Sequence, residues 1–124
     1  MQFARWVFRL AGAFGVLILL PLYFLEEQIG RDQPPPFTHP EFFYGFAGVA
    51  LAWQVAFLII SLDPPRYRLL MLPAIIEKFS FAGAVFVLFT LGRVAPTMLA
   101  AGLFDFILGV LFVAAYLKCP RSPR

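Results

Sequence analysis

The chain has 124 residues, of which 61% are hydrophobic, and its mean hydropathy is +0.83. Soluble domains contain about 45–50% apolar residues, so this composition excludes an ordinary soluble fold and favours a single integral membrane domain over residues 1–124. The net charge of +3 comes from basic residues at the ends of apolar segments, which argues against nucleic-acid binding. The single cysteine, Cys119, cannot form an internal disulfide, and no Cys/His spacing indicates a metal or a cofactor.

The first apolar segment predicts a membrane-spanning helix over residues 6–25. It begins like a secretory signal, but acids rather than small residues follow it, so we expect it to be retained. Pro21 is expected to bend this helix near its outer end. The proline-rich, acidic stretch 26–41 predicts an exposed loop. We expect its histidine, His39, to be solvated, because no second metal ligand has a suitable spacing.

The second apolar segment predicts a helix over residues 42–62. Trp53 lies near its middle, where the indole N–H would need a partner or a cavity. Three small residues and one amide fall on one helical face, which is expected to point inward because small residues let membrane helices approach closely. These residues are Ala47, Ala50, Gln54 and Ser61.

The connection to the third helix begins Asp63-Pro64-Pro65, an N-cap residue followed by prolines. It predicts a short amphipathic lead-in at the membrane surface, with Arg66 and Arg68 near lipid headgroups. Pro73 is then expected to mark a bend into a third helix over residues 73–91.

Gly92 is expected to end the third helix, and a short linker leads to a fourth helix over residues 96–117. A connection this short predicts an antiparallel hairpin. Asp105 falls on a face of small residues and is expected to look inward, together with Ala101, Gly102 and Gly109.

The distribution of Lys and Arg predicts that both termini are cytoplasmic. The predicted fold is therefore all-α, a four-helix transmembrane bundle with a short amphipathic lead-in before its third helix. Seven basic residues flank the apolar segments on the predicted inner side: Arg5, Arg9, Arg66, Arg68, Lys118, Arg121 and Arg124.

The third helix carries Glu77 and Lys78 within its apolar run, and charges at membrane depth need polar neighbours. Lys78 points about 100° away from Glu77 and is expected to snorkel to the inner interface. Gln54 and Glu77 should lie at one depth and Asp105 nearer the midplane, with water bridging the carboxyls. A candidate interior pocket contains Gln54, Glu77 and Asp105, with Trp53 and Ser80 at its wall. The alternative is that these polar groups only hold the helices together.

The chain resembles the small four-helix bacterial membrane proteins called DoxX-like. The resemblance rests on its length, its four spans, the Tyr44-Gly45-Phe46-Ala47-Gly48 opening of the second helix, and the Asp63-Pro64 turn with Arg66-Tyr67-Arg68. Some members of that group are accessory subunits of membrane oxidoreductases. The resemblance carries over no functional residues.

We expect a non-enzymatic protein of the bacterial cytoplasmic membrane, either an accessory subunit or a binder of lipid or another hydrophobic molecule inside the bundle. Its partners would be membrane lipid and a membrane protein or a second copy of the chain. Two alternatives use Glu77 and Asp105. They could act as acid and base in a proton-shifting isomerase with a lipid-soluble substrate, or relay protons in a coupled transporter.

Overall fold

A computed structural model describes residues 2–121, and its regular secondary structure over that range is helical. Four of its helices are long and apolar enough to cross a membrane. The long helices are α1 (Gln2–Leu19), α3 (Pro40–Leu62), α4 (Met71–Thr90) and α5 (Met98–Lys118). The short ones are η1 (Leu20–Phe24), α2 (Glu26–Asp32) and η2 (Arg68–Leu70).

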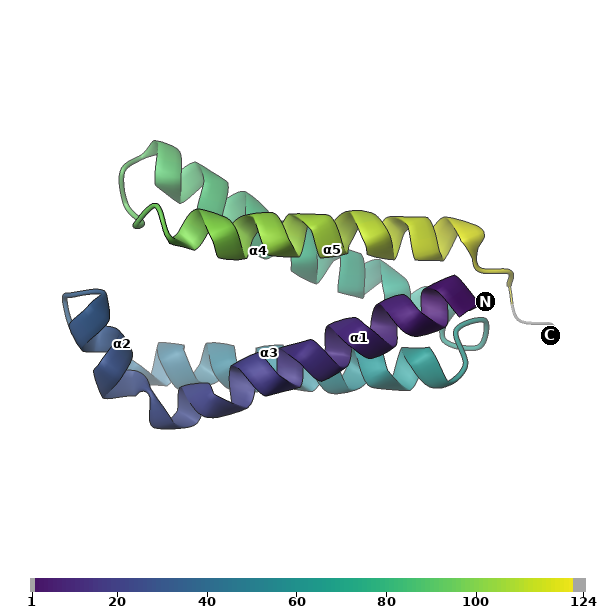
Figure 1. The fold of residues 1–124 in the computed structure, drawn as a ribbon, viewed down its shortest axis with the longest axis horizontal. Helices are drawn as coiled ribbons and strands as arrows, with labels where there is room; N and C mark the ends of the chain where they lie inside the picture. The colour runs from purple at the N-terminus through teal and green to yellow at the C-terminus, as the bar shows by residue number, and fades with distance from the viewer. Residues whose placement is uncertain (1, 122–124) are drawn as a thin grey trace.

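The long helices form two antiparallel hairpins, α1 with α3 and α4 with α5 (Figure 1). The hairpins meet where α1 begins and α5 ends, mainly through α1 and α5, and they diverge toward α2 and the α4–α5 loop (Figure 1). We call the end where they meet the closed end. The prediction of a four-helix bundle did not specify this divergence.

A cluster of three phenylalanine rings holds the hairpins together at the closed end. Phe8, Phe57 and Phe112 are fully buried, and their ring centroids lie 4.3 to 5.9 Å apart. Small buried residues beside the rings let the backbones approach: Ala4, Ala11, Ala74 and Ala115.

Aromatic rings also join the hairpins farther along the molecule. The contacts between hairpins there include two ring pairs, Phe14 with Phe104 at 5.0 Å and Phe46 with Phe81 at 6.4 Å.

The inward face predicted for the second helix is confirmed, since its four residues are all buried: Ala47, Ala50, Gln54 and Ser61. The predicted turn at Gly92 is also confirmed. Gly92 has a φ of 70°, and the backbone N–H groups of Gly92 and Arg93 donate to the carbonyls of Phe89 and Leu88. This pair of bonds is the Schellman motif, which caps α4 and starts the hairpin.

Two segments differ from the sequence prediction. The first, 26–41, is not loop throughout, because α2 forms within it. Glu26 and Glu27 occupy the first turn of α2 and Arg31 the last, which suits the helix dipole. The Tyr44 hydroxyl donates a hydrogen bond of 2.9 Å to Glu26, so α2 is tied to α3. At Pro21 the expected bend takes the form of a change from α-helix to the 3-10 helix η1.

The second difference is the lead-in before the third helix, which is a turn followed by η2 rather than an amphipathic helix. Helix α4 begins at Met71, so Pro73 lies in its first turn, where its missing N–H interrupts no helical bond. Arg68 packs against α5 instead of reaching for headgroups. Its guanidinium lies 3.8 Å from the centroid of the Tyr116 ring, and its Nε donates a 2.9 Å hydrogen bond to the Cys119 carbonyl.

Candidate functional site

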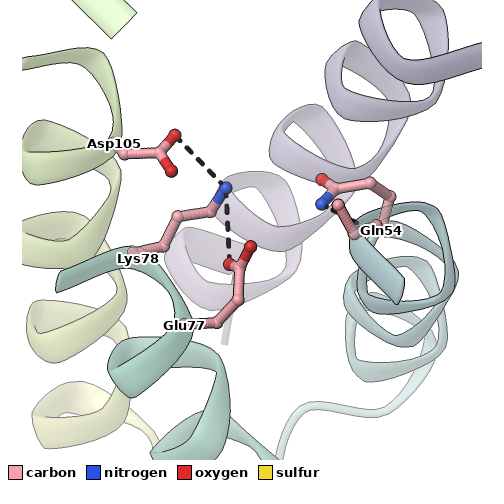
Figure 2. Close-up of polar contacts among 5 residues, drawn as sticks. Gln54, Glu77, Lys78 and Asp105 are labelled. Atoms are coloured by element: carbon pink, nitrogen blue, oxygen red, sulfur yellow. Dashed lines mark hydrogen bonds and ion pairs between the residues drawn. The ribbon is translucent and has the colours of Figure 1, made fainter. Parts of the chain in front are cut away.

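Three charged side chains form an ionic cluster between α4 and α5. Figure 2 shows Lys78 between Glu77 on its own helix and Asp105 on the facing one. The Lys78 Nζ lies 3.4 Å from Asp105 Oδ1 and 3.6 Å from Glu77 Oε2. The Lys78 side chain is 6% exposed, against 23% for Glu77 and 17% for Asp105. The two carboxyls therefore share one nearly buried cation.

The burial of Lys78 contradicts the expectation that it would snorkel to the interface. Lys78 falls on the buried face of α4, and the salt bridges to both carboxylates compensate its charge there. The sequence does contain a signal for this position. Lys78 follows the same three- and four-residue spacing as the other buried residues of α4, which are Met71, Ala74, Ala82 and Val85.

Glycines on α5 bring the two helices close enough for the cluster to form. A side chain at Gly102 would meet Val85, and one at Gly109 would meet the Phe79 ring, each at 2.9 Å. Both glycines are buried, as predicted for the small-residue face of Asp105, whereas Ala101, which was predicted on the same face, is exposed. The Lys78 ammonium also lies 5.3 Å from the centroid of Phe57 on α3, so the cluster borders the aromatic core.

Glu77 keeps an unused hydrogen-bonding position. Its Oε2 is buried and accepts no hydrogen bond within residues 2–121, although Lys78 stands 3.6 Å away. With both carboxyls ionised the cluster carries one net negative charge. A cluster with this charge can accept a proton or a hydrogen-bond donor. Its salt bridge between the two helices also fixes the register of α4 against α5.

The other residues of the predicted pocket do not join this cluster. Gln54 belongs to α3, and its Nε2 donates to the Ala50 carbonyl at 2.9 Å (Figure 2). The Gln54 side chain packs where a Cβ at Gly15 would be, so it serves the contact between α1 and α3. Trp53 packs near Phe57, with ring centroids 6.4 Å apart. Ser80 is exposed on α4.

A second feature is an apolar groove between α1 and α5 with a volume of about 760 Å³. Sequence reasoning did not identify it, because its two walls come from opposite ends of the chain. One wall is Gln2, Phe3, Trp6, Val7, Leu10, Ala11 and Phe14, and the other is Phe104, Leu108 and Leu111. We call it the α1/α5 groove.

His39 lies outside both features. Its Nδ1 is 3.3 Å from Glu41, and both side chains are mostly exposed. Across the described part of the chain, no three histidine, cysteine or acidic side chains are arranged to hold a metal ion.

No family model, curated protein or solved structure matches this chain.

Proposed function

We propose that this chain is a non-enzymatic integral membrane protein that binds a hydrophobic molecule in the α1/α5 groove. The groove carries the proposal. Nine of its ten lining residues are apolar or aromatic, which suits a hydrocarbon ligand. The binding position is thus between the two hairpins at their α1 and α5 faces, rather than at the polar residues inside the bundle.

The surroundings of the groove support a membrane setting. Large apolar side chains are exposed on all four long helices, among them Leu17, Val49, Ile76 and Leu117. Such side chains are stable where hydrocarbon surrounds them. We place both termini in the cytoplasm, because the closed end carries Arg5, Arg66 and Lys118 and the positive-inside rule assigns such an end to that side. We propose in addition that this membrane is bacterial and that the chain is one of the DoxX-like proteins.

The test is native mass spectrometry of the full chain after gentle solubilisation. We expect a retained hydrophobic molecule that is lost when Leu10→Trp and Leu108→Trp fill the groove. The matched control is Val49→Trp, which adds the same bulk to an exposed position of α3 and should leave the molecule bound. Protein that retains no hydrophobic molecule would refute the proposal.

The ionic cluster favours a second candidate, proton-coupled transport. Three ionisable groups meet at membrane depth, and one carboxylate oxygen of Glu77 lacks a hydrogen-bond donor among the described residues. Transport predicts that Glu77→Gln or Asp105→Asn abolishes proton-linked flux in liposomes. The same two substitutions test the isomerase alternative. Flux and turnover unaffected by either change would exclude both carboxyl-based functions.

A further inference from the structure

The α1 wall of the α1/α5 groove is about as long as one lipid leaflet is thick. The apolar part of this wall runs from Phe3 to Phe14, and 11 steps at 1.5 Å per residue give about 17 Å. The hydrocarbon core of a bilayer is about 30 Å thick, so one leaflet contributes about half of that. An acyl chain that starts at the closed end would therefore reach the midplane along this wall.

Two cations stand at the closed end of the groove, over the aromatic residues that line it. The Lys118 Nζ lies 4.5 Å from the centroid of Phe3, and the Arg9 guanidinium lies 5.3 Å from the centroid of Trp6. Arg9 reaches back by almost one turn toward the N-terminus, as a snorkelling side chain does. These contacts hold both charges beside the groove.

Carboxylates near this end are few, so an anion would meet little repulsion. Helix α1 contains two arginines and no acid. The acid of α5, Asp105, is paired with Lys78. Asp63 is at the closed end as well, in the connection between α3 and η2, and it is exposed to solvent.

From the leaflet length of the groove and the cations at its mouth, we infer that its occupant is an anionic phospholipid. One acyl chain lies between Leu10, Phe14 and Leu108, and the phosphate lies at Lys118 and Arg9. This inference rests on the proposed function and adds the headgroup charge and the leaflet. Because the cations are at the closed end, the lipid belongs to the leaflet on that side.

The inference is tested with two lipid probes of identical acyl chains, phosphatidylglycerol and phosphatidylcholine. The full chain in detergent is titrated with each, and native mass spectrometry gives the dissociation constants. We expect tighter binding of phosphatidylglycerol. Each of Arg9→Gln and Lys118→Gln should weaken it by about fivefold, and should weaken phosphatidylcholine by less, because the choline cation balances the charge of its phosphate. Arg93→Gln, in the α4–α5 loop, is the matched control and should change neither constant.

The possible outcomes separate the two proposals. Equal binding of both lipids, insensitive to Arg9→Gln and Lys118→Gln, overturns the headgroup inference and leaves the proposed function standing. Binding of neither lipid, with no other hydrophobic molecule retained, refutes both. A dimer that Leu10→Trp dissociates would show that a second copy fills the groove, which also overturns the inference. Far-UV circular dichroism of every variant checks that the helices are intact.

Discussion

Replacing Lys78 with methionine tests whether the ionic cluster holds α4 against α5. Methionine keeps the length and most of the volume of the side chain but removes the charge. The two carboxylates, now 17% and 23% exposed, would lose their shared cation. Breaking a buried ion pair by removing one partner costs about 3–5 kcal/mol, and we expect about 3 kcal/mol because both carboxyls keep some exposure.

The measurement is the free energy of unfolding in mixed micelles, followed by circular dichroism as sodium dodecyl sulfate is added. Arg93→Met is the control, since Arg93 is exposed in the α4–α5 loop. Asp105→Asn should cost less, about 1 kcal/mol, because Glu77 would still pair with Lys78. A triple variant of Lys78→Met, Glu77→Gln and Asp105→Asn should recover most of the loss. If Lys78→Met unfolds like the Arg93→Met control, the cluster does not stabilise the hairpin.

Three further predictions concern the contacts around the two hairpins. Gly12→Ala should lower the free energy of unfolding by about 1–3 kcal/mol, because its Cβ would lie 2.8 Å from the Gln54 backbone carbonyl. Gly83→Ala should raise the free energy of unfolding by about 0.5–1 kcal/mol, because a Cβ at Gly83 would have no atom within 4 Å. Similar effects of the two substitutions would contradict the packing. Arg68→Gln should destabilise by about 1–2 kcal/mol through the lost contact with Tyr116, whereas Arg66→Gln should have little effect in the same assay. Burial raises the pKa of the Cys119 thiol, so maleimide should label it slowly at pH 8 and much faster in unfolded protein. Because this pKa is higher in the folded state, stability from the thiol is fully present below the unfolded value and decreases as pH rises through the folded one. The comparison is the double variant Thr97→Cys, Cys119→Ser, whose single thiol lies at an exposed position. Labelling of Cys119 at the same rate as this thiol would refute the burial of Cys119.

The sequence predicted the four long helices because each is an apolar run of membrane-spanning length. Their bounds differ by a few residues at most ends. The Gly92 turn and the inward face of α3 were also predictable from local sequence. A glycine after an apolar run indicates a left-handed helix C-cap, and small residues at helical spacing indicate a packing face. The short helix α2 was not predicted, because the three prolines that follow it are typical of a loop.

The sites were harder to predict, because they depend on which helices become neighbours. Glu77 and Asp105 were identified as interior groups, but the helical wheel placed Lys78 on another face from Glu77. A flexible lysine side chain can still return to its neighbour's carboxylate, and the facing Asp105 made that position favourable. The α1/α5 groove had no signal in the sequence, since it joins residues about 100 positions apart.

The pairing of α1 with α3 and of α4 with α5 has a consequence for biogenesis. Each hairpin is built from two spans that are adjacent along the chain. The first hairpin can therefore form as a unit before the ribosome has completed the second hairpin. The connection Asp63–Tyr67 then lies between two preassembled halves. Coexpressed fragments divided there should associate through the three-phenylalanine contact. Fragments divided within the α4–α5 loop would instead separate two helices that share a buried salt bridge.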